Sequence, residues 1–426
     1  MDLQPPRGTV DLLPPEGGRM WALYQRAATW AHRFGYRYAE TPAFEHTELF
    51  RRSSGESSDV VRKEMYTFED RGERSLTLRP EATAAIVRAY LQRRHGLPVP
   101  LKVFTVEPMW RYGRPQSGRL REFRQFDAEI VGEGGPGADV EVVAVGEAFI
   151  REAIDRPLEL QIKSIGDEQC RPAYRAELIE FLRANRERLR DEHRDHFEDN
   201  PLRVLDCKDD ACRAVAAEAP KIVDRLCEPC ASHFAEVREG LGAEGIEYVL
   251  VPTLVRGLDY YTRTTFEWVS GRLARGQDSV GGGGRYDGLA EVIGGPATPA
   301  VGFAIGLERV RLLAPETAEA APMADVERPD AFVVGIGEGT LATTAAVART
   351  LRAAGLGVDR SFEARPLGAQ MRAADRSGTR FAVIIGEREA AAGTVTWRRL
   401  SDGEQHEGSV EAAAAAIAGG REEGPA

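Results

Sequence analysis

Two alternating segments joined by a cationic loop constrain the fold of this chain more than any other feature. Residues 101–110 (LKVFTVEPMW) and 121–132 (REFRQFDAEIVG) alternate apolar and polar side chains, as strands with one buried face do. Between them, residues 111–120 contain the glycines and the proline that are typical of a turn. We therefore expect an antiparallel pair of strands with a long connecting loop.

Shifts in pattern along the 426 residues indicate two or three domains. Strand and helix patterns fill residues 1–166 and return at residues 251–312. The intervening residues 167–250 form charged helical stretches, which indicates an inserted helical domain. Residues 313–328 are rich in Ala, Pro and Glu and are expected to be a linker. Residues 329–426 alternate strand and helix like a separate small α/β domain, so the predicted fold class is α/β (α+β).

Composition narrows the class of protein. Hydrophobic residues make up 42% of the chain and charged residues 29%, as in globular proteins. The formal net charge of −11 argues against a general nucleic-acid-binding protein. No apolar run approaches the roughly 18–20 residues that cross a bilayer, and the N-terminal residues lack the pattern of a signal peptide. We therefore expect a cytoplasmic protein with no membrane partner.

The loop between the two predicted strands is locally cationic although the chain is acidic. Its arginines and those of its flanks are Arg111, Arg114, Arg119, Arg121 and Arg124. Guanidinium groups on a strand and on a mobile loop could together hold a triphosphate or the phosphates of a nucleic acid. The alternative is a solvent-exposed hairpin whose arginines form surface salt bridges.

Carboxylate and amide side chains indicate a second type of ligand. Gln125 and Glu129 lie four residues apart on the second strand and therefore share a face, and Glu81 follows Arg79-Pro80 at the start of a predicted helix. Such a face can accept hydrogen bonds from an ammonium group, as an amino acid substrate requires. Equally, these residues could be ordinary polar side chains.

Residues 254–261 (LVRGLDYY) contain further candidates. Arg256 could stabilise negative charge that develops on a phosphoryl or acyl-phosphate group. Tyr260 and Tyr261 are expected to alternate across a strand, so that only one hydroxyl group faces a site. Adjacent tyrosines can also serve packing alone.

A glycine run at residues 281–284 would allow a ligand to approach the backbone closely. Arg285, Tyr286 and Asp287 follow it directly, and Arg309 lies near the start of a later helix, where it could reach a phosphate. The run lacks the spacing of a dinucleotide-binding motif.

All five cysteines lie in the predicted helical insertion. Cys207, Cys212, Cys227 and Cys230 could form a four-thiolate zinc site, since the CxxC limb matches structural zinc sites. The alternative is that they are buried, reduced thiols. The seven histidines have no ligand-like spacing with one another, and we assign them no catalytic role.

These motifs occur in an order that resembles the bacterial histidyl-tRNA synthetases, which are class II aminoacyl-tRNA synthetases. The motifs are RGTVDLLPPE at residues 7–16, RPEAT at 79–83, the WR…REFRQFDAE hairpin, LVRGLDYY at 254–261, GGGGRYDGL at 281–289 and GFAIGLERV at 302–310. The resemblance extends over nearly the whole chain. It implies a class II antiparallel sheet flanked by helices, with a helical insertion and a C-terminal α/β anticodon-binding domain.

The resemblance also implies roles in ATP binding and catalysis. Arg111 and Arg309 would hold the ATP phosphates, Arg119 would lie beside the nucleotide, and Phe123 would stack under adenine. Arg256 would act, with Arg111 and Arg309, as a catalytic cation at the α-phosphate and the substrate carboxylate.

For the amino acid, the resemblance implies eight binding residues: Glu81, Ala82, Thr83, Gln125, Glu129, Tyr260, Tyr261 and Tyr286. Glu81, Thr83 and Gln125 would take the α-amino group. Glu129, Tyr261 and Tyr286 would take the imidazole, because a carboxyl and a phenol can satisfy both ring nitrogens.

The implied reaction is activation of L-histidine by ATP with Mg²⁺, followed by transfer of the histidyl group to tRNA(His), in a homodimer. One alternative is a non-catalytic, histidine-sensing regulatory paralogue of the ATP phosphoribosyltransferase complex, which generally lacks the C-terminal domain. Another is a class II synthetase for threonine, proline or glycine. One departure from the family pattern is Gly113, where family members commonly carry an acidic residue.

Overall fold

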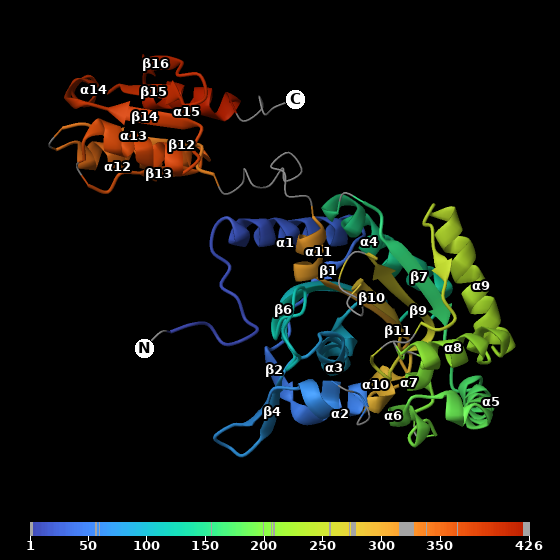
Figure 1. Ribbon diagram of the computed structural model, residues 1–426. Coiled ribbons are helices and arrows are strands. Elements are labelled where there is room, and N and C mark those ends of the chain that lie inside the picture. Colours follow the sequence, from blue (N-terminus) through green and yellow to red (C-terminus); the bar gives the residue numbers. More distant parts are fainter. Residues whose placement is uncertain are drawn as a thin grey trace. The chain divides into compact units, whose positions relative to one another are not determined.

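A computed structural model forms two compact units, Met1–Glu316 and Thr317–Ala426, each with its own hydrophobic core (Figure 1). It describes residues 3–55, 58, 60–154, 156–198, 200–205, 207, 209–254, 257–271, 273, 278–314, 328–337, 339–363 and 365–420. Among these residues, no helix has both the length and the apolar character that a membrane span requires.

The first unit is built on an eight-stranded sheet in the order β1-β5-β6-β11-β10-β9-β7-β8. The expected antiparallel arrangement is confirmed for the inner strands, but β1 pairs with β5 and β7 with β8 in parallel, so the sheet is mixed. The strands are β1 (Arg37–Tyr38), β5 (Leu101–Trp110), β6 (Glu122–Val131), β7 (Glu159–Ser164), β8 (Val249–Leu250), β9 (Thr262–Val269), β10 (Ser279–Arg285) and β11 (Ala300–Gly306).

The predicted hairpin is present as β5 and β6, which pair from Leu101 opposite Val131 to Trp110 opposite Glu122. Because side chains alternate along a strand, one face of β6 is apolar and the other is polar. Phe126 packs in an aromatic core with Phe149 and Phe303, whose ring centroids both lie 5.1 Å from its own. The odd-numbered polar side chains of β6 therefore face the opposite side of the sheet.

Helices α1 (Glu16–Arg33), α4 (Pro136–Ala153) and α9 (Glu228–Ala243) contribute side chains to the core on that apolar face. In α1 the buried positions include Met20, Leu23, Ala27 and Ala31, which follow helical spacing. Apolar residues at helical spacing over residues 20–34, followed by Gly35, predict a helix that stops there. Helix α1 ends at Arg33, and Gly35 adopts a φ of +79° just after it.

The other face carries a small sheet and several short helices. The sheet has the order β2-β4-β3, with β2 (Phe44–His46), β3 (Thr67–Glu69) and β4 (Ser75–Leu78). The helical elements are α2 (Thr47–Ser54), η1 (Val60–Glu64), α3 (Thr83–Arg93), η2 (Arg94–Gly96) and α10 (Leu289–Val292). Helix α11 (Leu307–Leu313) instead packs its apolar side chains into the main core with α1.

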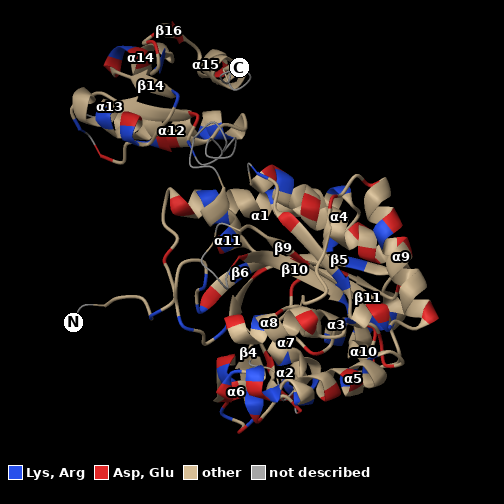
Figure 2. Cartoon of the chain, turned by 45° about the vertical axis from the view of Figure 1, so that its right-hand side comes forward, with Lys and Arg blue, Asp and Glu red and all other residues tan. Residues whose placement is uncertain are grey.

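Between β7 and β8 the chain is helical, as the charged pattern predicts. The elements are α5 (Arg171–Ala184), η3 (Arg186–Arg188), α6 (Asp191–Arg194), α7 (Leu202–Leu205), α8 (Asp210–Glu218), η4 (Ile222–Asp224) and α9. Leu178, Leu182 and Val215 belong to a separate small core, whereas Phe234 and Leu241 of α9 join the main core. Basic and acidic side chains are interspersed on the outer helices, among them α4 and α9 (Figure 2).

The second unit has a five-stranded sheet in the order β13-β12-β14-β15-β16. Its inner strands β12 and β14 are parallel, and β15 and β16 add an antiparallel edge. The elements are β12 (Ala331–Gly335), α12 (Thr340–Ala353), β13 (Val358–Arg360), α13 (Leu367–Arg376), β14 (Phe381–Ile385), α14 (Glu387–Ala392), β15 (Val395–Arg399), β16 (Gln405–Gly408) and α15 (Val410–Gly419). This alternation agrees with the predicted small α/β domain.

Candidate active site

A cleft with a cavity volume of about 340 Å³ lies on the polar face of the large sheet. Its walls come from segments that are far apart in the sequence: the start of α3, the β5–β6 hairpin, the loop before β9, the glycine-rich strand β10, β11 and the start of α11. Such a concave site that combines apolar walls with convergent polar groups is the usual form of a small-molecule site.

One end of the cleft is strongly cationic. Arg111, Arg119 and Arg309 all line it. Burial lowers the pKa of Arg309 below its usual range, and the charges of Arg111 and Arg119 lower it further. Guanidinium groups this close repel one another, and an anion bound between them relieves that repulsion, so this part of the cleft suits a polyphosphate.

Contacts with the main chain fix the orientation of two of these arginines. Arg309 Nε donates to the Gly118 carbonyl at 3.0 Å, and its Nη1 donates to the Ser279 carbonyl. Arg111 Nε donates to the Pro80 carbonyl at 2.8 Å. These bonds hold both groups in place before a ligand binds.

Arg119, on the hairpin loop, is held by a carboxylate from another element. Glu64, at the end of η1, lies 2.5 Å from Arg119 Nη2. Gly113 has no side chain, and a Cβ atom there would lie 2.9 Å from Arg119 Nε. The guanidinium group therefore occupies space that a side chain at position 113 would need, and the nearby carboxylate comes from Glu64.

Beside Arg111 lies a flat apolar surface. The Arg111 guanidinium carbon is 5.3 Å from the centroid of the Phe123 ring, which also lines the cleft. A purine base could stack on such a ring.

The other end of the cleft is lined by acidic and amide side chains of α3 and β6. Glu81 accepts hydrogen bonds from the Ala84 backbone N–H near the start of α3, and burial raises its pKa. Gln125 Oε1 and both carboxylate oxygens of Asp127 are buried and have no hydrogen-bond partner among the described residues. Acceptors of this kind are costly unless a ligand supplies donors.

Asp127 is the most perturbed carboxyl of this group. Its pKa lies well above its usual range because it is buried, and because Glu129, Glu81 and Glu107 lie near it. Arg79, which forms a buried ion pair with Glu107 at 2.6 Å, offsets only part of this effect. A bound ammonium group would supply the missing positive charge.

Glu129 lies behind the cleft wall and is 1% exposed. Thr83 Oγ1 donates to its carboxylate at 2.6 Å, and the Tyr286 hydroxyl group donates to it as well. Burial raises the pKa of Glu129 to about 8, although both hydrogen bonds act in the opposite direction.

Aromatic rings surround these hydroxyl and carboxyl groups. The Tyr260 ring centroid lies 4.8 Å from that of Tyr261 and 5.6 Å from that of Tyr286. All three tyrosines line the cleft. The pocket is therefore a flat-walled space that ends in phenol groups, with a carboxyl group behind them.

Glu129 fits this position because glycine occupies the facing site of the neighbouring strand. Gly302 of β11 pairs with Glu129 of β6, and a Cβ atom on Gly302 would overlap the Glu129 carboxylate. The glycines of β10 likewise leave no room for side chains, since a Cβ atom on Gly283 would overlap the backbone of β11.

Comparisons with known proteins agree with this geometry. A family model described as histidyl-tRNA synthetase matches residues 8–310, and one described as an anticodon binding domain matches residues 330–419. The histidine–tRNA ligase of Moorella thermoacetica is 48% identical over 406 residues, which cover 94% of this chain and 95% of the relative. That of Desulforamulus reducens is 44% identical and covers 95% and 96% of the two chains.

The chain belongs to the histidyl-tRNA synthetase family.

Solved structures agree with this assignment. Apo histidyl-tRNA synthetase of S. aureus superposes with a TM-score of 0.78 at 30% identity, covering 97% of this synthetase and 99% of that chain. A Bacillus halodurans protein described as an ATP phosphoribosyltransferase regulatory subunit/histidyl-tRNA synthetase has a TM-score of 0.63 at 21% identity, covering 91% and 98% of the two chains. The second likeness concerns the fold alone.

The structure brings most of the predicted site residues of this synthetase to one cleft. Those that line it are Glu81, Thr83, Arg111, Arg119, Phe123, Gln125, Tyr260, Tyr261, Tyr286 and Arg309. Glu129 contacts two of these residues from behind, and Ala82 is buried next to Glu81. Arg256 lies outside the described residues, although Gly257 and Leu258 line the cleft.

The expectation that Tyr260 and Tyr261 alternate across a strand is wrong. Strand β9 begins at Thr262, so both tyrosines lie in the loop before it, and both rings reach the cleft. Side chains alternate between two faces only in a strand, so neighbouring residues of a loop can point to the same side.

The predicted grouping of the four cysteines is also wrong. Cys227 and Cys230 lie with Asp167 and Cys170, whereas Cys207 and Cys212 lie with His193. The first pair belongs to the end of the insertion, which returns to the main sheet, and the second pair belongs to its separate core. Sequence spacing alone could not show that the insertion has these two parts.

Sequence analysis did not identify Glu64, Asp127 or Glu267, all of which line the cleft. Asp127 lies midway between Gln125 and Glu129 on the same strand, so the two-residue period could have identified it. Nothing local in the sequence marks Glu64, since its contact with Arg119 joins elements 55 residues apart.

The arginines of the hairpin make different contacts, and not all of them line the cleft. Arg124 pairs with Glu122 and Glu308, and the Arg121 guanidinium carbon lies 3.8 Å from the Tyr112 ring centroid. Arg285, after the glycine run, is fully buried and bonds Asp139, Asp287 and two main-chain carbonyls, so it supports the sheet and does not face the cleft.

Proposed function

We propose that this synthetase activates L-histidine with ATP and transfers the histidyl group to the 3′ end of tRNA(His). The observation that carries this proposal is the polarity of the cleft. Three arginines of its lining lie near one another, and buried acceptors without partners among the described residues lie on strand β6. This arrangement suits a nucleotide triphosphate at one end and an amino acid at the other.

In the first step, a carboxylate oxygen of histidine attacks the α-phosphorus of ATP. The bond to the β-phosphate oxygen breaks, and pyrophosphate leaves with the electron pair. Arg111 and Arg309 hold the phosphates, and Arg119 and Phe123 hold the nucleotide. Arg256, two residues before the cleft-lining Leu258, is the further cation proposed at the α-phosphate and the carboxylate.

Mg²⁺ is proposed to accompany the triphosphate and to neutralise part of its charge. Glu267 of β9 lines the cleft and offers the oxygen ligands that Mg²⁺ prefers. The donor set of the cleft therefore fits the ion.

Histidine would place its ammonium group between Glu81, Gln125 and Asp127, whose acceptors are buried. Thr83 lines this part of the pocket, and Ala82 is buried next to Glu81. Its imidazole would lie among Tyr260, Tyr261 and Tyr286, with Glu129 behind. A site whose carboxyl and phenol groups need donors and acceptors on the ligand rejects side chains that lack them.

In the second step, a terminal ribose hydroxyl group of tRNA attacks the acyl carbon, and AMP leaves. The basic hairpin loop is proposed to meet the acceptor end, and the C-terminal unit to hold the anticodon stem. We also propose that the protein acts in the cytoplasm.

A homodimer is proposed on the basis of exposed aromatic residues on the edge strand β1 and on the small β2-β4-β3 sheet. Tyr38, Phe44 and Phe68 are 54%, 50% and 43% exposed, and the Phe44 and Phe68 rings lie 6.1 Å apart. An apolar surface of this kind is typical of an interaction site. Sedimentation should give twice the chain mass, and a Phe44→Glu/Phe68→Glu variant should sediment as a monomer.

Histidine-dependent exchange of pyrophosphate into ATP tests the proposed activity directly. We expect exchange with histidine and not with threonine, proline or glycine. Arg309→Gln should lower kcat/KM by about 100-fold or more, since it removes a preorganised charge at the phosphates. Arg311→Gln, on the same helix but paired with Glu16, is the matched control and should stay near wild type.

No exchange with folded protein would favour the regulatory alternative. That alternative is less supported, because the named relatives are ligases matched over at least 94% of this chain, and the anticodon-binding unit is present.

A further inference from the structure

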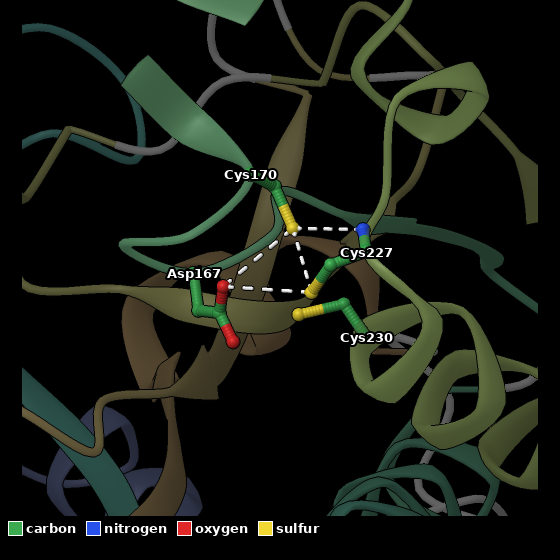
Figure 3. Close-up of side chains that lie close together, drawn as sticks. All are labelled: Asp167, Cys170, Cys227 and Cys230. Carbon is green, nitrogen blue, oxygen red and sulfur yellow. Dashed lines mark hydrogen bonds between the residues drawn. The ribbon is translucent and has the colours of Figure 1, made fainter. Parts of the chain in front are cut away.

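One cluster of metal-ligating side chains lies outside the cleft. Asp167, Cys170, Cys227 and Cys230 place their donor atoms within 4.8 Å of one another (Figure 3). The sulfur of Cys170 lies 3.2 Å from that of Cys227 and 3.5 Å from an Asp167 oxygen, which lies 3.8 Å from Cys227 Sγ. Two segments, one after β7 and one at the start of α9, thus meet at this point.

These separations are close to those of a small tetrahedral site. An ion at about 2.3 Å from sulfur and about 2.0–2.2 Å from oxygen separates its ligands by roughly 3.5–3.8 Å. Cys170 and Cys230 are 3% and 0% exposed, so the cluster is largely shielded from solvent. Three thiols and one carboxylate complete a set of four ligands, as closed structural zinc sites require.

Two helix N-termini point toward this cluster and favour negatively charged ligands there. Cys170 precedes the 14-residue helix α5, and Cys227 precedes the 16-residue helix α9, so both lie at positive ends of helix dipoles. The Cys227 backbone N–H donates to Cys170 Sγ at 3.1 Å. Arg263 Nη2 lies 3.6 Å from Asp167 and offsets part of the negative charge.

We propose that Asp167, Cys170, Cys227 and Cys230 bind one structural Zn²⁺ ion. The ion displaces the thiol protons as it binds. The second group, His193, Cys207 and Cys212, supplies three ligands among the described residues, one fewer than a closed tetrahedral site needs.

The proposed ion would fix the turn that supports one wall of the cleft. Arg171, next to Cys170, donates to the main-chain carbonyls of Tyr261 and Ile165. The Arg263 backbone N–H donates to the Gly166 carbonyl at 2.8 Å. Tyr261 lines the cleft, so the ion would position this tyrosine through the turn that holds its carbonyl.

Metal analysis of protein expressed without added zinc and purified without chelator tests the site. We expect about one equivalent of zinc per chain. Cys170→Ser and Cys230→Ser should each lose most of it, whereas Cys212→Ser, the matched control from the other group, should retain it. Less than about a tenth of an equivalent in the wild type, or loss in Cys212→Ser alone, overturns the proposal.

Two further measurements remain informative if the serine variants fold poorly. Cobalt-substituted wild-type protein should show the intense visible absorption of a tetrahedral thiolate site. Mass spectrometry without reductant should find these three cysteines free of disulfide bonds, and a Cys170–Cys227 disulfide in the freshly purified protein overturns the proposal. Removing the metal should raise KM for histidine several-fold while KM for ATP changes less.

Discussion

At the scale of single residues, Glu129 is a carboxyl group that is almost fully buried behind the wall of the cleft. Its pKa in the ligand-free protein is raised to about 8, mainly by burial. A carboxyl whose pKa is raised on folding stabilises the protein fully below its unfolded-state pKa. That contribution is lost as the pH rises through the folded-state pKa. Each unit of pKa shift between the unfolded and folded states changes the free energy of unfolding by about 1.4 kcal/mol.

Glu129→Gln should therefore flatten the pH dependence of stability. Wild-type melting temperature should fall relative to that of the variant as the pH rises from about 5 to about 9, because only the wild type must ionise a buried carboxyl. Thermal unfolding across this range measures the effect, with exposed Glu411→Gln as the control. If melting temperature depended on pH in the same way for the wild type and Glu129→Gln, the raised pKa of Glu129 would be contradicted.

Gly302→Ala should impair histidine recognition through the same carboxyl. The added methyl group overlaps the Glu129 carboxylate and forces it away from Thr83 and Tyr286. We expect KM for histidine to rise by about tenfold or more, since misplacing such a group costs at least about 1.4 kcal/mol, with a smaller change in KM for ATP. Gly242→Ala, where a Cβ atom meets nothing within 4 Å, should behave like wild type.

At the scale of elements, η1 and the hairpin loop are linked by Glu64 and Arg119. Glu64→Gln should let Arg119 move, and it should lower kcat/KM for ATP by about three- to tenfold, a modest effect because the pair is partly exposed. Glu48→Gln, which removes an exposed pair with Arg52 on α2, is the control. Pyrophosphate exchange measured at varied ATP concentration gives kcat/KM for each variant. Equal kcat/KM values for Glu64→Gln and Glu48→Gln would show that Glu64 does not position Arg119.

The elements that sequence predicts best are those with one buried face. The β5–β6 hairpin, α1 and the second unit follow from periodicity, because burial of one face imposes the pattern. Periodicity does not predict the positions of Tyr260 and Tyr261. Their rings reach the cleft from a loop, whose path depends on contacts with distant segments.

The site residues likewise divide into those that sequence motifs predict and those that depend on contacts between distant segments. Those carried by motifs of the hairpin and the glycine run lie in one cleft, since neighbouring strands bring them together. Glu64 could not be predicted, because it reaches Arg119 from another element. Spacing in the sequence groups Cys227 with Cys207 and Cys212, whereas in the fold its sulfur lies beside that of Cys170, 57 residues away.

At the scale of the whole molecule, each of the two units has a hydrophobic core of its own. A chain that ends within residues 315–327 should therefore keep histidine-dependent exchange within about threefold of wild type, because the cleft belongs to the first unit. Transfer to tRNA should fall by at least about 100-fold, since each 1.4 kcal/mol of lost tRNA binding is a factor of ten.

Exchange and charging assays on this variant separate the two steps. Efficient charging by the shortened chain would contradict the proposed role of the C-terminal unit, and loss of exchange would contradict the independence of the cleft.

Arg285 has a consequence for how the protein is made. Its charge is compensated by Asp139, which precedes it by 146 residues and also lies 3.3 Å from His233 Nε2. Leaving one member of such a buried pair alone costs about 3–5 kcal/mol. A nascent chain therefore cannot complete this core until β10 has left the ribosome. Fragments from interrupted translation should be degraded rapidly by proteases, before they can sequester ATP or histidine.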